Sequence, residues 1–158
     1  MKIQYIVPVL IAIVFILLVS LMKEPGRRSF MAILVAGAGA AYLSGGGFGK
    51  WELVFCTVMA ICAYQGLGSY RFIGIGWLLH TAWDILHHLY GNPLLPFDVT
   101  SSLGCAICDP VIAVWCFAGA PSIFRKAAAK EFRIQNSESR IEDAELFLLV
   151  LHILNSGF

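Results

Sequence analysis

Long apolar runs, separated by short segments that carry most of the charges, dominate the first 124 residues of this chain. Hydrophobic residues make up 59% of its 158 residues and charged residues only 13%. A soluble domain has roughly 45–50% apolar residues, glycine included, and about 25% charged residues. A run of about 20 apolar residues is long enough to cross a bilayer as a helix. The pattern therefore predicts an all-α fold, a polytopic transmembrane helical bundle.

Five apolar segments are expected to span the membrane, and turn-forming or charged residues separate them. The first run has the length of a signal peptide, but a basic cluster and no A-x-A-like cleavage site follow it, so we interpret it as a retained span. Beyond the bundle of residues 1–124, the polar residues 125–158 are expected to form a cytoplasmic tail with a short apolar terminal helix. The expected spans are residues 3–22, 30–49, 51–68, 72–90 and 102–124.

Lysine and arginine fall on alternate loops, and this alternation orients the predicted bundle. The second loop has only Lys50, and the fourth loop has neither lysine nor arginine. Positive charge gathers on the cytoplasmic side of membrane proteins. We therefore expect a multi-pass protein of the cell membrane with its N-terminus outside and its C-terminal tail in the cytoplasm. The basic residues of the first loop, the third loop and the early tail are Lys23, Arg27, Arg28, Arg71, Arg125, Lys126, Lys130 and Arg133.

The charge balance also limits the partners. The formal net charge is +1 and no basic face is apparent, so nucleic acid is not an expected partner. The lipid bilayer is the expected one. In the second span Ala32, Ala36, Ala40 and Ser44 recur at four-residue spacing. Such a stripe of small residues lets another helix approach closely, which makes it a candidate contact for a homo-oligomer.

One predicted span, within Gly76–Gly91 (GWLLHTAWDILHHLYG), holds three of the four histidines and an aspartate. His80, Asp84 and His88 are four residues apart, so they are expected to share one helix face. His87 is expected to flank that face. Ionisable groups at bilayer depth are costly and rare, so this stretch is a candidate functional site.

Acidic residues of two other predicted spans reach a similar depth. Glu52 begins the third span on the outer side, and Asp109 enters the fifth span from that side. Because Pro110 follows it, Asp109 is either the N-cap of a short helix or lies inside a longer helix from about Ser101 that the proline kinks. In both cases unsatisfied backbone groups gather near Asp109, which protein or a cavity must accommodate.

Imidazole and carboxylate groups at this spacing can bind a metal ion. His80, Asp84 and His88 are candidate ligands of zinc or iron. His87 and Asp109 are candidate catalytic groups or further ligands. An open coordination position would activate water, so we predict a metal-dependent hydrolase or oxidase that acts on an amphipathic substrate. Two alternatives stay open: a path for protons or divalent cations, and a hydrogen-bonded network that only ties helices together.

The five cysteines do not have the spacing of a secreted disulfide framework. Cys105 and Cys108 form a CxxC motif at the outer end of the fifth span. The motif has three interpretations: a redox-active pair, zinc ligands together with His87 or His88, or two small packed residues.

Two runs, GWLLHTAWDILHHLYGNPLLPF and SSLGCAICDPVIAVWCFAGAPS, resemble a family of small polytopic membrane proteins of unknown function. The resemblance covers about Ile73–Phe124, and the family's His-x3-Asp-x2-His-His motif falls on His80, Asp84, His87 and His88. It implies a membrane fold and no particular reaction. The chain is more loosely similar to membrane metal-dependent lipid hydrolases of the alkaline ceramidase type, which use His and Asp within helices but have more spans and a separate His pair.

Overall fold

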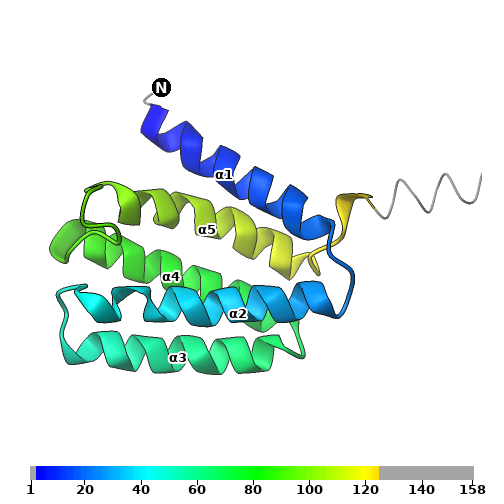
Figure 1. Cartoon of the computed structure of the whole chain (residues 1–158), viewed down its shortest axis with the longest axis horizontal. Helices are drawn as coiled ribbons and strands as arrows, with labels where there is room; N and C mark the ends of the chain where they lie inside the picture. Colours follow the sequence, from blue (N-terminus) through cyan, green and yellow to red (C-terminus); the bar gives the residue numbers. More distant parts are fainter. Residues whose placement is uncertain (1–2, 125–158) are drawn as a thin grey trace, which may run out of the picture. The chain divides into compact units, whose positions relative to one another are not determined.

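The computed structural model of the chain describes residues 3–124. The chain divides into two units, residues 1–121 and 122–158. The predicted all-α class is confirmed for the described residues, whose five α-helices all lie in the first unit (Figure 1). The elements in chain order are α1 (Ile3–Ser20), α2 (Gly26–Ala40), the 3-10 helix η1 (Ala41–Ser44), α3 (Lys50–Gly66), α4 (Tyr70–Tyr90) and α5 (Ser101–Phe117).

Each predicted span overlaps one of these helices, and the largest differences at the ends occur in the second and fifth spans. In the second span the α-helix begins earlier, at Gly26, and gives way to η1 after Ala40. In the fifth span α5 begins at Ser101, continues through Pro110 and ends at Phe117. Asp109 therefore lies inside a long helix and is not the N-cap of a short one. The predicted tail and its terminal helix lie outside the described residues.

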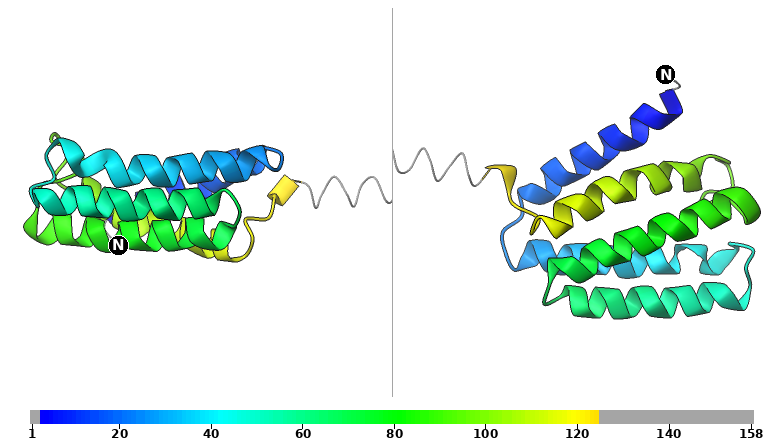
Figure 2. Two further views of the ribbon diagram at one scale, coloured as in Figure 1. Left: turned by 90° about the horizontal axis from the view of Figure 1, so that it is seen from below. Right: turned by 180° about the vertical axis from the view of Figure 1, so that it is seen from behind.

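Within the first unit, α2, α3, α4 and α5 pack side by side, and consecutive helices run in opposite directions (Figures 1 and 2). The most extensive contacts join α4 to α5 and α2 to α3. The first helix packs on α5 and diverges from it toward the N-terminus (Figure 2). The bundle thus has two ends. One carries the α1–α2 and α3–α4 connections, and the other carries the connections η1–α3 and α4–α5.

The end with the α1–α2 connection is basic, and buried arginine explains the early start of α2. The Arg27 guanidinium donates hydrogen bonds to Glu24 Oε1 from Nε (3.0 Å) and Nη2 (2.7 Å). The Tyr70 hydroxyl donates to the same oxygen at 2.6 Å. Arg28 Nε donates to the carbonyl oxygen of Leu67 at 2.8 Å. These bonds join the α1–α2 connection to the α3–α4 connection. They pair two of the three guanidinium nitrogens of Arg27, and Nη1 has no hydrogen-bond partner among the described residues.

Among the described helices, α1 alone is long and apolar enough to cross a membrane by both criteria: it has 18 residues and a mean hydropathy of 2.7. It lies near the N-terminus, and α5 is apolar but shorter. Signal sequences and core helices of soluble proteins share these two properties. Helix length and hydropathy therefore leave the multi-pass prediction unconfirmed.

Close packing of α2 on α3 depends on Gly39. A Cβ at this position would clash with Met59 Cβ and lie 2.9 Å from Met59 Cγ, whereas a Cβ at Gly37 would meet nothing within 4 Å. We expect Gly39→Ala to lower the free energy of unfolding by about 1–3 kcal/mol through overpacking. The matched Gly37→Ala should be neutral or stabilise by up to about 1 kcal/mol, because alanine favours the helix. Thermal unfolding of both variants checks this, and equal melting temperatures would contradict the close α2–α3 packing.

Candidate functional site

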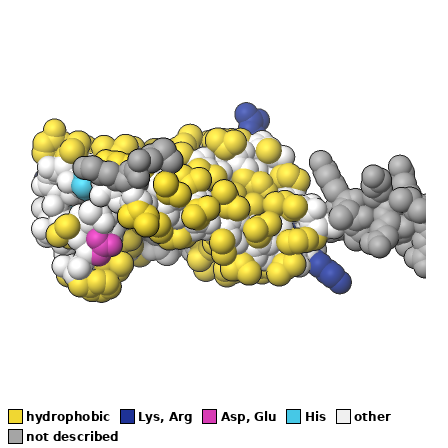
Figure 3. All heavy atoms as spheres, turned by 90° about the horizontal axis from the view of Figure 1, so that it is seen from above, with side chains coloured by type: hydrophobic (Ala, Val, Ile, Leu, Met, Phe, Trp, Pro, Cys, Tyr) yellow, Lys and Arg dark blue, Asp and Glu magenta, His cyan; other side chains and the backbone are white. Residues whose placement is uncertain are grey.

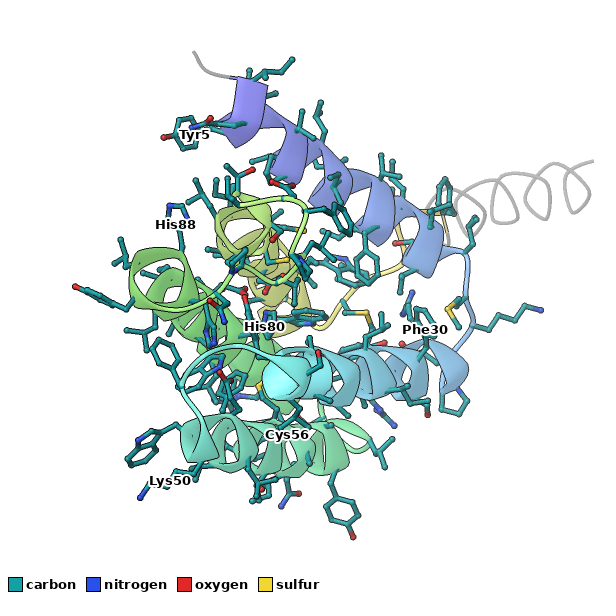
Figure 4. All side chains as sticks on the ribbon, turned by 60° about the vertical axis from the view of Figure 1, so that its left-hand side comes forward. Tyr5, Phe30, Lys50, Cys56, His80 and His88 are labelled. Atoms are coloured by element: carbon teal, nitrogen blue, oxygen red, sulfur yellow. The ribbon has the colours of Figure 1, made fainter. Side chains whose placement is uncertain are left out.

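A stripe of three ionisable side chains runs along the buried face of α4. His80, Asp84 and His87 are 3%, 0% and 1% exposed, whereas His88 is exposed. Figure 4 shows His80 at the centre of the bundle and His88 at its edge. The structure therefore does not bring the predicted ligand His88 to the site. On an α-helix, the residue eight positions after His80 lies well off the face of His80. The residue seven positions after it lies within about 20° of that face.

His80 lies between two carboxylates, one from its own helix and one from α5. Its Nδ1 atom is 2.7 Å from Asp109 Oδ2 and 2.9 Å from Asp84 Oδ2. All three side chains are buried, and one ligand atom from each lies within 4.8 Å of the others. The i, i+4 spacing on α4 supplies two of the groups, and the long α5 brings the third across the α4–α5 contact. The carboxylate of Asp109, the residue just before Pro110, thus reaches the bundle interior.

Two atoms of this group have no hydrogen-bond partner among the described residues. His80 Nδ1 faces two carboxylates and must act as a donor, and Nε2 on the other edge of the ring has no partner. Asp84 Oδ2 is at hydrogen-bond distance from His80 Nδ1, but the angle does not suit a hydrogen bond, so this oxygen is also unsatisfied. Buried polar atoms without partners are uncommon in folded proteins, and binding of an ion or water is one explanation for them.

A hydrogen-bonded chain fixes the second oxygen of Asp84. The Tyr42 hydroxyl of η1 donates to Asp84 Oδ1 at 2.6 Å. Tyr42 then accepts from the Ser102 hydroxyl at 2.8 Å, because its one proton is already used. Ser102 in turn accepts from the backbone N–H of Leu94 at 3.0 Å. Oδ1 is therefore occupied by a donor, and Oδ2 is the oxygen free to bind a ligand.

A second buried pair, Glu52 and His87, lies beside this group. His87 Nε2 is 2.9 Å from Glu52 Oε1, and Trp83 Nε1 donates to Glu52 Oε2 at 3.1 Å. The backbone N–H of Phe48 donates to Glu52 Oε1 at 3.2 Å. The ring of His87 stacks on Tyr42, with centroids 3.8 Å apart. This pair therefore ties α3, α4 and the η1–α3 loop together.

The protonation of this pair follows from its hydrogen bonds. His87 Nδ1 lies 2.9 Å from the carbonyl oxygen of Trp83, which only accepts, so Nδ1 carries a proton. The opposite atom, Nε2, faces a carboxylate oxygen of Glu52. A lone pair facing a lone pair would repel, so a further proton lies between these two atoms, either on the imidazole or on the carboxyl group. The pair therefore shares one proton between Nε2 and Oε1, in addition to the proton on Nδ1.

Sequence reasoning selected four of the buried ionisable groups at this end of the bundle by their depth: His80, Asp84, Asp109 and Glu52. It placed His87 beside the site, and the structure pairs it with Glu52. Tyr42 and Ser102 were not predicted; a tyrosine within an apolar span, whose hydroxyl needs a partner, is the signal that points to Tyr42. Cys105 and Cys108 are free thiols, half-buried and outside the metal-binding group.

Comparison with known proteins identifies the family. The profile of a family described only as of unknown function, DUF6010, matches residues 3–122, so the chain belongs to this family. The predicted resemblance to a family of unknown function is confirmed at that level, and the match extends well upstream of Ile73. No curated protein and no solved structure matches the chain.

Proposed function

We propose that this DUF6010 protein is a membrane-embedded metalloenzyme. One divalent ion, zinc or iron, is held by His80, Asp84 and Asp109, and the centre hydrolyses or oxidises an amphipathic substrate. The observation that carries the proposal is the set of three buried ligand atoms within 4.8 Å of one another. Buried charges are normally paired or bind metals, and this set offers two carboxylates for a single imidazole.

The distribution of polarity supports a position inside the bilayer. Ionisable side chains lie inside the bundle, while large apolar side chains cover its outside, among them Ile61, Leu89 and Val114, which are 57%, 59% and 69% exposed. Figure 3 shows hydrophobic side chains over most of one face, with lysine and arginine gathered at one end. Exposed apolar surface of this extent is typical of contact with lipid. The 21 residues of α4 would extend about 31 Å, close to the thickness of the hydrocarbon core.

The donor set fits the proposed ions. Zinc and iron both accept imidazole nitrogen and carboxylate oxygen. The two unsatisfied atoms, Asp84 Oδ2 and His80 Nε2, belong to two of the three proposed ligands. Binding through Nδ1 would replace the proton that His80 now directs at the two carboxylates, so metal affinity should rise with pH. When bound, such an ion acts as a Lewis acid and lowers the pKa of coordinated water.

The residues around the group would orient it and connect it to the outer end of the bundle. Tyr42 lines a pocket of about 320 Å³ at that end, together with Ser44, Asn92 and Pro93. Its hydroxyl also reaches Asp84. Tyr42 therefore stands between this pocket and the proposed ligands, and it holds Asp84 in the rotamer that directs Oδ2 toward His80.

We expect Tyr42→Phe to weaken metal binding by about 10–100-fold, the usual effect of removing a hydrogen bond to a metal ligand. The measurement is zinc affinity by competition with a chromophoric chelator. Tyr64→Phe is the matched control, because Tyr64 is 74% exposed and should leave the affinity unchanged. Equal affinities for Tyr42→Phe and wild type would contradict the orienting role of Tyr42.

The transport alternative receives less support from the described residues. A path for protons or cations needs polar groups through the full depth of the bundle. In the half nearer the basic end, the described core is apolar except for Ser20 and Arg27, which lie beside the α1–α2 connection. Its buried side chains include Met31, Val35, Ile73, Ile112, Ala113 and Cys116. The polar groups thus form a site that faces one side.

Metal analysis of the purified protein tests the proposal. We expect one zinc or iron ion per chain in wild type and in His88→Ala, because His88 is exposed and away from the group. Asp109→Asn should lose the ion, since it removes one anionic ligand and keeps the side-chain volume. A metal content that is absent in wild type, or that Asp109→Asn leaves unchanged, would overturn the proposal.

A further inference from the structure

A groove of about 410 Å³ lies between the N-terminal halves of α1 and α5. It forms where α1 diverges from α5 (Figure 2). Its walls come from one face of each helix and from the loop before α5, and none of its lining residues belongs to the proposed metal ligands. A volume of this size falls near the lower end of the range for small-molecule sites, which suits one hydrocarbon chain.

The lining of the groove changes in character along its length. At the end where both helices begin, Gln4 and Ser101 present polar groups. Further along α1, Val7 and Ile11 make apolar walls, and Leu103 does so two residues after Ser101 on α5. A ligand that matches both parts has a polar head at the outer end of the bundle and an apolar chain that points toward its middle.

Among the described residues, Asp98 is the only charged side chain that lines the groove. Its Oδ1 atom accepts hydrogen bonds from the backbone N–H of Thr100 at 2.9 Å and from the Thr100 hydroxyl at 2.8 Å. These two bonds hold the pKa of Asp98 below its usual range, so the carboxylate is ionised at neutral pH. The second oxygen, Oδ2, is left exposed for an external cation, and the mouth of the groove is negative.

We propose that the groove binds a single-chain amphiphile with a cationic head group. The head lies at Asp98, and the chain runs between α1 and α5 past Val7, Ile11 and Leu103. The negative mouth selects the sign of the head group, and the divergence of α1 lets the chain enter from the lipid. This site rests on the proposed membrane position of α1 and α5 and is independent of the metal centre.

The cysteines provide a local probe of the groove. Cys105 and Cys108 line it, whereas the equally half-buried Cys56 lies on α3 and is absent from its lining. The experiment measures the rate at which methyl methanethiosulfonate modifies each cysteine of the full chain in phosphatidylcholine nanodiscs. Peptide mass spectrometry reports each site separately. The ligands are dodecyltrimethylammonium and dodecyl sulfate, which share a chain and differ in the sign of the head.

We expect dodecyltrimethylammonium to protect Cys105 and Cys108 and to leave Cys56 unaffected. Dodecyl sulfate should protect them only at higher concentration. Asp98→Asn keeps an acceptor for Thr100 but removes the charge, so it should raise the dodecyltrimethylammonium concentration for half-protection about fivefold, as expected for one exposed ion pair. Its metal content should equal that of wild type.

Four results would overturn the proposal. Equal protection by the two amphiphiles, or no effect of Asp98→Asn, would show that the groove does not prefer a cationic head group. Equal protection of Cys56 would show a general effect on the bilayer. Protection that grows with protein density in the absence of ligand would show that a second copy of the chain covers the groove.

Discussion

Replacing Asp84 by alanine is expected to lower the free energy of unfolding by about 3–5 kcal/mol, the range for removing one partner of a buried ionic group. Asp84 is fully buried, and its two oxygens face the Tyr42 hydroxyl and His80 Nδ1. The alanine variant removes the acceptor of the Tyr42 hydroxyl and one of the two carboxylates that face His80 Nδ1, and it opens a cavity beside them. Equilibrium unfolding in mixed micelles measures the effect.

Two variants on the same helix serve as controls for this result. Asp84→Asn keeps an oxygen for the Tyr42 hydroxyl, so its cost should be smaller, about 1–3 kcal/mol. His88→Ala alters an exposed side chain and should change stability by no more than about 0.5 kcal/mol. If Asp84→Ala unfolds like wild type, Asp84 does not lie in the interior of the bundle.

The second large effect is expected at Glu52. Its carboxylate accepts from Trp83 Nε1 and from the backbone N–H of Phe48, and it shares a proton with His87. Glu52→Ala removes the acceptor for all of these buried groups, so we expect a loss of about 3–5 kcal/mol. The same unfolding measurement applies. Because none of these groups is a proposed metal ligand, the metal content should stay at one ion per chain in the folded fraction.

Glu52→Gln separates the charge of this residue from its shape. The amide oxygen still serves one donor, so the loss should be smaller than for alanine. Lys50→Ala, at an exposed position of the same helical turn, controls for a change at the start of α3. Equal stability of Glu52→Ala and Lys50→Ala would show that the Glu52–His87 pair does not hold the helices together.

Most of the fold could be predicted from the sequence because each helix coincides with one apolar run. The ends of a helix were harder to predict where they depend on a contact with a residue distant in the sequence. Arg27 is charged and is expected in a loop, but its guanidinium pairs with Glu24 and Tyr70, and α2 begins at Gly26. Periodicity within one run contains no information about such a contact.

The depth of the site in the bundle could be predicted from the sequence, but the exact set of residues that form it could not. The topology placed Asp84, Asp109 and Glu52 at one level, and the structure brings the first two together around His80. Steps of four residues predict that His88 shares the face of His80. In the structure His88 is exposed, and His87, seven residues after His80, lies on the buried face. The contacts of Tyr42 and Ser102 depend on how η1 and α5 dock, which no local pattern reports.

The central claim is that one imidazole and two carboxylates bind a metal ion inside the bundle. X-ray absorption spectroscopy of the zinc-loaded protein tests it most directly, because imidazole, carboxylate and thiolate ligands give different distances and scattering. We predict a single imidazole contribution with nitrogen and oxygen ligands at about 2.0–2.2 Å, and loss of bound zinc in the double variant Asp84→Asn/Asp109→Asn. A spectrum without histidine, a sulfur shell at about 2.3 Å from Cys105 and Cys108, or full zinc binding by the double variant would contradict the claim.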